Sequence, residues 1–159
     1  MKFTIRKAVK SDMPAVLNLI KELAVFEKEE KEAILTVKDL ENDGFGDQPL
    51  FYCFVAEYEA KIVGIALSYL RYSTWKGKAL HLEDLIVNMD YRSSGLGTLL
   101  LDEVVKLGSN LNVKRVSWEV LDWNTNAIEF YEKKGAKILK DWHLVQLDEE
   151  RINNYLIAI

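Results

Sequence analysis

A run of small residues stands between a segment typical of a strand and a segment typical of a helix. The strand-like segment HLEDLIV covers residues 81–87, and apolar residues recur at helical spacing from residue 96 to residue 107. Between them the chain reads Arg92-Ser93-Ser94-Gly95-Leu96-Gly97-Thr98. Successive small residues let backbone N–H groups converge on an anion, and the N-terminal end of the following helix adds further donors. The run is therefore either a phosphate-binding loop, to which Arg92 adds charge, or a plain glycine turn.

Two widespread phosphate-binding motifs do not fit this loop. It lacks a lysine followed by serine or threonine, so it is not a P-loop. The pair Gly95 and Gly97 is followed by Leu100 where a dinucleotide-binding fingerprint has its third glycine. What remains is the pattern Arg-x-x-Gly-x-Gly directly after a strand.

Two carboxylates, Glu83 and Asp84, interrupt the apolar segment LHLEDLIV. Apolar residues occupy positions 80 and 82, then 85 and 87, so the alternation slips by one residue across the carboxylates. The slip predicts a β-bulge, although a strand buried on both faces would tolerate it as well. Because an unpaired buried charge is costly, Glu83 either pairs with a lysine or caps a turn, or it handles a proton or a substrate amine.

The elements that must position these residues follow from periodicity and from turn and cap residues. Ser11 is the N-cap candidate for the first expected helix and Thr36 for the short second one. Asn124 is the N-cap candidate for the helix that Gly135 ends. Glu59 and Ala60 leave a tight connection between two strand-like segments, which predicts a hairpin. The expected strands are 2–8, 50–58, 61–72, 79–87, 113–121, 136–141 and 143–148, and the expected helices are 12–26, 37–43, 96–107, 125–134 and part of the tail 149–159. This order predicts one mixed α/β domain around a central sheet flanked by helices.

Composition narrows the function further. The chain has 159 residues, 49% of them apolar, and a net charge of −4 with scattered basic residues, which argues against nucleic-acid binding. Cys53 is the one cysteine and lies in an apolar run, so we expect a buried structural thiol. His81 and His143 show no metal-ligand spacing, so no metal is expected. No apolar run approaches the ~18 residues of a membrane span and the first residues lack a signal core, which predicts a cytoplasmic protein without a membrane partner.

Several segments resemble the GNAT acetyltransferases. LHLEDLIVNMDYRSSGLG, LDWNTNAIEFYEKKGA, LIKELAVFE and LTVKDLENDGFGDQP are similar to the spermidine/spermine (diamine) N-acetyltransferase branch, and YSTWKGK with VLDWN is similar to its thialysine N-epsilon-acetyltransferase relatives. The resemblance covers essentially the whole chain. It implies a single GNAT domain over residues 1–159, acetyl-CoA as co-substrate, a small-molecule amine as acceptor, and a homodimer, which the apolar tail also favours.

The resemblance also implies which residues bind acetyl-CoA. In GNAT enzymes the pantetheine arm pairs with the backbone of a splayed strand, here the stretch of Leu85, Ile86 and Val87, and an N–H group there can stabilise the thioester oxyanion. The pyrophosphate would lie on the loop. The implied contacts from the loop and from the last long helix are Arg92, Ser93, Ser94, Gly95, Leu96, Gly97, Thr98, Asn124, Asn126, Ala127 and Tyr131.

Amine acetylation needs proton transfers, for which the candidates are Glu83, from its place in an apolar strand, and Tyr131, from the resemblance. An alkyl ammonium has a pKa near ~10.4, so at pH 7 only about one molecule in 2500 is the free amine that attacks a thioester, a deficit of about 4.6 kcal/mol. Glu83 is the expected base, acting through a water. Tyr131 lies in a helical apolar stripe typical of a core position. Its match to the family's tyrosine makes it the expected acid for the departing thiolate.

The resemblance implies an acceptor site lined by the end of the first helix and the loop after it, with the loop before the fourth strand close by. Its expected residues are Phe26, Glu27, Trp75, Glu83, Asp84 and Glu119. Trp75 can hold a cation over its ring or simply pack on its loop. Where polyamine-acetylating members have an acidic residue before a Pro-Trp pair, this chain has Ser73-Thr74-Trp75. The change favours a shorter amine or an amino acid such as thialysine or lysine, with putrescine and spermidine still open.

The sequence thus predicts an acetyl-CoA-dependent N-acetyltransferase in which the amine attacks directly in a ternary complex. Cys53 lies outside the site segments, so no covalent nucleophile is expected. Two alternatives stay open: a non-catalytic acyl-CoA-binding regulatory protein with the same fold, and an enzyme that acetylates a protein or peptide amine.

Overall fold

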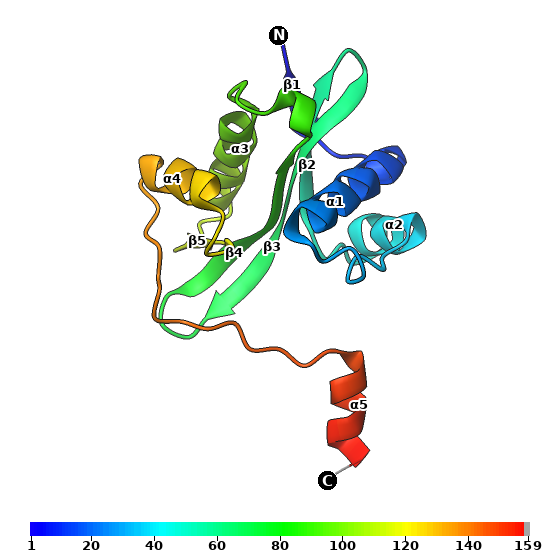
Figure 1. Cartoon of the computed structure of the whole chain (residues 1–159), viewed down its shortest axis with the longest axis vertical. Helices are drawn as coiled ribbons and strands as arrows, with labels where there is room; N and C mark the ends of the chain where they lie inside the picture. The colour runs from blue at the N-terminus through cyan, green and yellow to red at the C-terminus, as the bar shows by residue number, and fades with distance from the viewer. Residues whose placement is uncertain (158–159) are drawn as a thin grey trace. The chain divides into compact units, whose positions relative to one another are not determined.

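The computed structural model describes residues 1–157 (Figure 1), and the chain forms two compact units. The first unit covers Met1–Glu119 and the second begins at Val120. The first contains the whole central sheet, and the second contains two helices.

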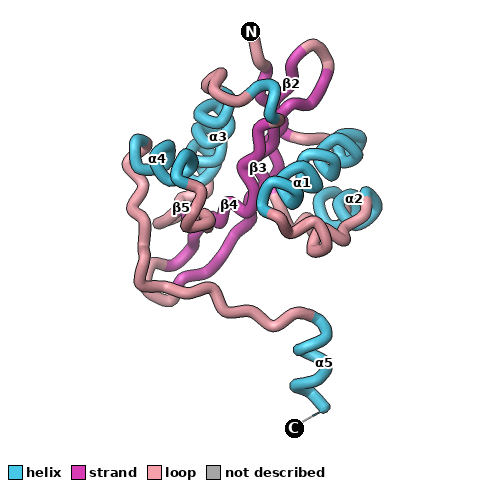
Figure 2. Tube along the Cα trace, in the orientation of Figure 1, coloured by secondary structure: helices cyan, strands magenta, loops and turns pink. Residues whose placement is uncertain are grey.

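A five-stranded mixed sheet forms the centre of the first unit (Figure 2). Its strands, in spatial as well as chain order, are β1 (Thr4–Lys7), β2 (Tyr52–Tyr58), β3 (Lys61–Ser73), β4 (Gly77–Val87) and β5 (Val116–Ser117). Neighbouring strands from β1 to β4 are antiparallel, and β5 is parallel to β4. The predicted mixed central sheet is therefore confirmed.

Helices cover both faces of this sheet (Figure 1). On one face lie α1 (Met13–Glu27) and α2 (Val37–Phe45), and on the other lies α3 (Leu96–Asn110). A core of α1, α2 and strand side chains is built around Met13, Val16, Val55 and Ile65, all fully buried. Two short 3-10 turns, η1 (Lys10–Asp12) and η2 (Met89–Tyr91), precede α1 and the glycine loop. Burial of this apolar surface fixes α1 against the strands that carry the candidate site.

Local signals explain most of the helix and turn positions. Thr36 caps α2, with its hydroxyl accepting from the N–H of Asp39 at 3.2 Å, as predicted. Glu59 and Ala60 form the predicted tight hairpin turn with φ of 48° and 62°. Such left-handed values match the twist of a two-residue hairpin, at a steric cost because neither residue is glycine. The N-cap position of α1 is Asp12 rather than Ser11. The Asp12 carboxylate makes no cap hydrogen bond to α1, because it accepts from Arg6 and from the N–H of Val9 instead.

The fifth strand is much shorter than predicted. Of the expected range 113–121, only Val116 and Ser117 pair with β4, opposite Leu80 and His81. The turn Lys114–Arg115 is tied to the start of β4 by N–H···O bonds of 2.9 Å. From His81 to Val87, β4 pairs with β3, and no other strand of this unit pairs with it beyond His81. The second half of β4 therefore presents one backbone edge that no strand of the unit occupies.

The second unit contains α4 (Thr125–Lys133) and α5 (Glu149–Ile157). The predicted strands at 136–141 and 143–148 are wrong, because among the described residues this segment forms turns and coil. Its apolar side chains alternate as in a strand, but Leu144 is 69% and Val145 is 88% exposed. An alternating pattern becomes a strand only when a second backbone supplies hydrogen bonds. The predicted helical tail is confirmed for α5, and its last two residues lie outside the described part.

Candidate active site

An acidic cavity of about 590 Å³ lies in the first unit. Its walls come from α1, the segment after it, α2, β3 and β4, and they include the aliphatic side chains of Ile20, Leu23 and Leu67. Its acidic lining residues are Glu27, Glu29, Glu32, Asp43, Glu83 and Asp84. Neither lysine nor arginine lines this cavity among the described residues. Apolar walls with an uncompensated negative charge suit a cation that carries a hydrocarbon chain.

A β-bulge in β4 brings both predicted carboxylates to this cavity. Leu67 of β3 pairs with Asp84, and the next residue, Ser68, pairs with Leu82, so Glu83 is the extra residue. The predicted bulge is confirmed. In a regular strand Glu83 and Asp84 would point to opposite faces. Because the bulge breaks the alternation, both line the same cavity.

The crowding of carboxylates changes their acidity. Burial, followed by the charges of Glu83 and Glu27, raises the pKa of Asp84 to about 7. Burial, with the charge of Glu29, also raises the pKa of Glu27. A positive ligand would reverse both effects, since an adjacent cation favours the charged form of a carboxyl group.

Glu83 is held by neighbours on the same face of the sheet. The hydroxyl of Tyr69 donates a hydrogen bond of 2.9 Å to Oε2 of Glu83. The Nε2 atom of His81 lies 3.5 Å from the same oxygen. About half of the Glu83 side chain is exposed, so the carboxylate is fixed in place and still accessible from the cavity.

The glycine loop, residues 92–98, connects η2 to α3 through left-handed backbone. Ser93 has φ of 59° and Gly95 has φ of 83°, and no atom would obstruct a β-carbon on Gly95. Glycine is therefore needed there for its backbone angle rather than for space. The hydroxyl of Ser94 donates to the carbonyl of Tyr91 at 2.5 Å. Buried Leu96 anchors the start of α3, whose first N–H groups have no intrahelical acceptor.

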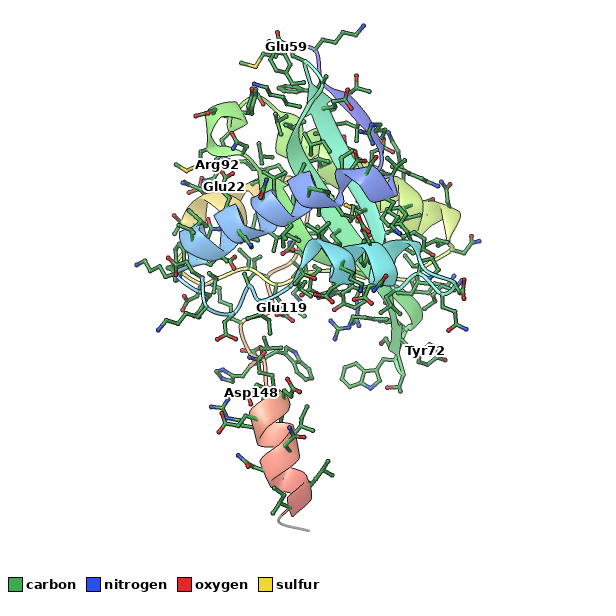
Figure 3. The ribbon with its side chains drawn as sticks, turned by 90° about the vertical axis from the view of Figure 1, so that its right-hand side faces the viewer. Glu22, Glu59, Tyr72, Arg92, Glu119 and Asp148 are labelled. Atoms are coloured by element: carbon green, nitrogen blue, oxygen red, sulfur yellow. The ribbon has the colours of Figure 1, made fainter. Side chains whose placement is uncertain are left out.

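Arg92 connects the glycine loop to the end of α1. Its guanidinium lies 5.0 Å from the ring centre of Phe26, and its Nε donates to the carbonyl of Val87 at 3.1 Å. Glu22 supports the same turn by accepting from Asn88 Nδ2 at 2.9 Å and from the N–H of Met89 at 3.1 Å. Figure 3 labels Arg92 and Glu22 along this edge. Sequence reasoning missed Glu22, because no local pattern links a residue of α1 to a turn 67 residues later.

In the second unit, Asn124 and Tyr131 lie on α4. Asn124 is the N-cap, as predicted, and its side-chain oxygen accepts from the N–H of Ala127 at 3.2 Å. Asn126 lies in the first turn of the same helix. Tyr131 is 8% exposed, and burial raises the pKa of its phenol to about 12. The phenol is therefore protonated at physiological pH, and its ring centre lies 5.1 Å from that of Phe130.

Three residues predicted for the acceptor site, Phe26, Trp75 and Glu119, lie outside the lining of the acidic cavity. Trp75 is in the turn between β3 and β4, is 79% exposed, and is followed by Lys76, whose N–H bonds to Ser73 Oγ. Glu119 is exposed just after β5. Its charge nevertheless reaches the site, because it contributes to raising the pKa of Tyr69, after burial and Glu83.

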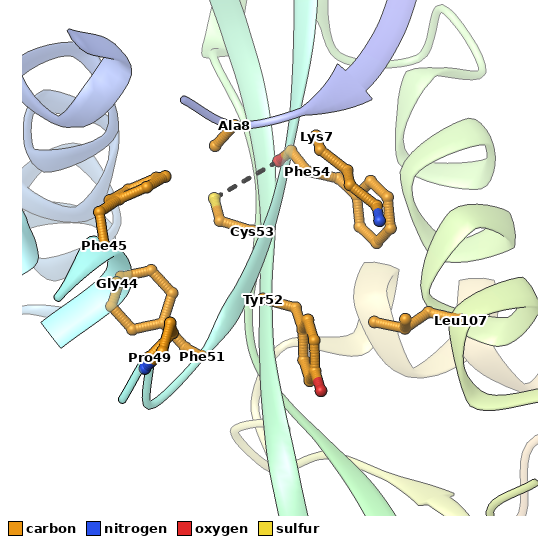
Figure 4. A pocket seen from close by; sticks show the side chains of 10 residues that line it. All are labelled: Lys7, Ala8, Gly44, Phe45, Pro49, Phe51, Tyr52, Cys53, Phe54 and Leu107. Carbon is orange, nitrogen blue, oxygen red and sulfur yellow. Dashed lines mark hydrogen bonds between the residues drawn. The ribbon is translucent and has the colours of Figure 1, made fainter. Parts of the chain in front are cut away.

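Cys53 lines a separate hollow of about 340 Å³ together with Phe45, Phe51 and Tyr52 (Figure 4). Its Sγ donates to the carbonyl of Phe54 at 3.7 Å, and burial raises the pKa of the thiol to about 12. A thiol in this state is not a nucleophile, which confirms the predicted structural thiol.

The described residues include no group of three or more potential ligands arranged to hold a metal ion. Residues 1–157 likewise contain no helix with the length and apolar character needed to cross a membrane.

The Acetyltransferase (GNAT) family profile matches residues 13–136 of the chain. The chain therefore belongs to the GNAT acetyltransferase family and is an acetyltransferase, and the predicted GNAT fold is confirmed.

Individual relatives narrow the comparison. Thialysine N-epsilon-acetyltransferase of Bos taurus is 34% identical over 157 residues, which cover 92% of this chain and 92% of that protein. The spermidine/spermine N(1)-acetyltransferase-like protein 1 of Homo sapiens is 37% identical over 160 residues, covering 94% of this chain and 23% of that protein. An integron cassette protein of V. cholerae has the same fold, with a TM-score of 0.80 over 98% of both chains at 20% identity. The predicted resemblance to this branch of the family is thereby confirmed.

Proposed function

We propose that this acetyltransferase moves an acetyl group from acetyl-CoA to the primary amine of a small molecule, by direct attack within a ternary complex. The observation that carries the proposal is the acidic, aliphatic-walled cavity whose lining includes Glu83 and Asp84. A protonated amine on a hydrocarbon chain gains from both the charge and the walls of such a site.

Acetyl-CoA binds on the glycine loop and the unpaired edge of β4 in this proposal. The pyrophosphate takes the N–H groups at the start of α3 and the charge of Arg92, with Ser93, Ser94, Gly97 and Thr98 around it. The pantetheine arm follows Leu85, Ile86 and Val87. Residues Asn124, Asn126 and Ala127 of α4 contribute further contacts to the coenzyme.

Starting from the ammonium, the chemistry requires two protons to leave the nitrogen and one proton to reach the sulfur. Glu83, through a water, takes the first proton from the ammonium, and the freed lone pair attacks the thioester carbonyl carbon. A backbone N–H of Leu85–Val87 stabilises the resulting oxyanion. The C–S bond then breaks, and Tyr131 gives its phenolic proton to the departing thiolate. The nitrogen of the tetrahedral intermediate loses its second proton, which returns through water to the Tyr131 phenolate, and Glu83 releases the first proton to solvent. The products are the N-acetylated amine, free CoA and one proton.

The acceptor is a thialysine- or lysine-like amino acid or a diamine or polyamine. Two observations support an amino-acid acceptor. One is the relative named for thialysine, and the other is Ser73, which stands in the loop before β4 in place of an acidic residue. Glu27 and Asp84 serve the distal cationic group, and Phe26, Trp75 and Glu119 complete the entrance.

We further propose one GNAT domain over residues 1–159 and assembly as a homodimer. The exposed apolar residues that follow α4, Leu144, Val145 and Leu147 among them, favour association with a second copy. Light scattering at micromolar concentration tests this, and a monomer there overturns it.

Turnover assays with a panel of acceptors test the proposed activity. The purified protein is incubated with acetyl-CoA and thialysine, lysine, putrescine, spermidine, spermine or a peptide amine, with CoA release followed and products identified by mass. A preference for thialysine or lysine supports the amino-acid branch. Faster turnover of the peptide amine favours a protein acetyltransferase. Tight CoA binding without turnover of any amine overturns the proposal in favour of a non-catalytic acyl-CoA-binding protein.

A further inference from the structure

A buried histidine stands next to Glu83, and the proposed chemistry does not use it. His81 is 5% exposed and lies on β4 directly opposite Tyr69 of β3, with their ring centres 5.2 Å apart. Arg71, two residues further along β3, points to the same face and reaches the imidazole. One connected group of side chains thus lies beside the acidic cavity, and it consists of Arg71, His81, Tyr69 and Glu83.

Hydrogen-bonding rules fix the tautomer of His81. Nη1 of Arg71 lies 2.9 Å from Nδ1 of His81. Arginine can only donate hydrogen bonds, so Nδ1 must be the accepting nitrogen and the ring proton must be on Nε2. Nε2 faces Oε2 of Glu83 at 3.5 Å.

Two side chains approach the same carboxylate oxygen. Tyr69 donates to Oε2 of Glu83 at 2.9 Å, and Nε2 of His81 lies 3.5 Å from that atom. Both contacts are to Oε2 rather than to Oε1. A carboxylate held from one side in this way has a fixed base orientation.

We propose that Arg71 and His81 are positioning residues of the active site: Arg71 locks the Nε2–H tautomer of His81, which in turn holds Glu83 as the base. The inference rests on the proposed role of Glu83, and it makes His81 a pH sensor of that role. Protonation of His81 would place N–H against the Arg71 guanidinium and break the lock. It would also convert the contact with Glu83 into a charged pair that competes with the incoming amine.

The surroundings of His81 keep this protonation at low pH. Burial lowers the pKa of His81, and so does the charge of Arg71, whereas Glu83 and then Glu119 act in the opposite direction. The neutral phenol of Tyr69, whose pKa is raised to about 12, completes the groups that face the ring. Removal of Arg71 therefore raises the pKa of His81 and moves its protonation toward the working range.

Nuclear magnetic resonance of the full-length protein tests the lock without turnover. Imidazole nitrogen shifts are expected to show the Nε2–H tautomer, with a titration below that of free histidine. Arg71→Met should raise the titration midpoint, whereas Lys61→Met, which removes the same charge at the other end of β3, should leave it unchanged. An Nδ1–H tautomer of His81, or a His81 titration midpoint that is unchanged by Arg71→Met, overturns the proposal that Arg71 fixes the tautomer.

Kinetics test the consequence for the base. His81→Phe is expected to lower kcat by about ten- to a hundredfold with an unchanged KM for acetyl-CoA, because a displaced base loses rate rather than coenzyme affinity. His81→Gln, whose amide can donate from the position of Nε2, should restore most of kcat and remove the contribution of His81 protonation from the pH profile. Equal losses in both variants, with thermal stability retained, overturn the positioning role. Absence of turnover in the wild type contradicts the proposed function instead, and leaves the tautomer measurement to decide the lock.

Discussion

Replacement of Asp84 by asparagine should stabilise the unliganded protein, and increasingly so as the pH rises. The pKa of Asp84 is raised from 3.8 to about 7, mainly by burial. Below pH 3.8 the carboxyl group is neutral in both folded and unfolded chains. Between pH 3.8 and 7 the unfolded chain loses the proton and the folded one keeps it. Stability therefore falls with rising pH in this window and stays low above it.

The size of the effect follows from the shift. About three pKa units at 1.36 kcal/mol each set an upper bound of about 4 kcal/mol on the total penalty. Of this, about 2–3 kcal/mol develops between pH 5 and pH 8. Asparagine carries no such pH-dependent term, and its buried amide costs a roughly constant ~1 kcal/mol. The stability difference between Asp84→Asn and wild type should thus grow by about 2–3 kcal/mol from pH 5 to pH 8.

Urea denaturation at pH 5, 6, 7 and 8 measures this difference. Asp102→Asn, an exposed aspartate of α3, is the matched control and should show no such growth. A diamine or lysine at saturating concentration should stabilise the wild type at pH 8 more than Asp84→Asn, because a cation offsets the charge of the aspartate. A difference between variant and wild type that is independent of pH would refute the assignment of Asp84 as a strained carboxyl group.

Three further outcomes are expected. Tyr131→Phe should fold normally and bind CoA as tightly as wild type by calorimetry, yet lose about ten- to a hundredfold in kcat, since the ring is retained and the proton is not; an unchanged kcat contradicts the acid role. Glu83→Gln should lose about a hundredfold or more in kcat at pH 7, and the loss should shrink toward pH 10 as free amine accumulates, so a deficit constant with pH excludes a base. Gly95→Ala should destabilise the protein by about 1–2 kcal/mol through its left-handed φ and weaken acetyl-CoA binding; unaltered CoA affinity by calorimetry would show that the glycine loop is a plain turn.

Local chemistry explains why much of the fold could be predicted from the sequence. Alternation, cap residues and turn residues act within a few positions, so the hairpin at Glu59 and the caps at Thr36 and Asn124 were predictable. The bulge at Glu83 was also predictable, because the alternation of apolar and polar residues slips by one position within the segment itself.

What could not be predicted depends on contacts between distant segments. The length of β5 is set by how many of its residues pair with β4, and the residues of β5 alone do not specify this. The segment 136–148 has the alternation of strands without a pairing backbone among the described residues. Glu22 at the turn after β4 and Arg71 at His81 are both long-range pairs whose partners carry no local signal.

Two partly buried aspartates show how the fold separates a structural charge from a functional one. The carboxylate of Asp12 accepts from Arg6 at 2.6 Å and from the N–H of Val9 at 2.8 Å, and these bonds hold its pKa below the ordinary value. Asp84 lies beside two other carboxylates, and its pKa is raised. A charge needed only for stability is satisfied within the chain, as at Asp12. A charge left uncompensated in a cavity costs stability until a cation arrives, so under the proposed function an amine bound beside Asp84 would relieve this cost.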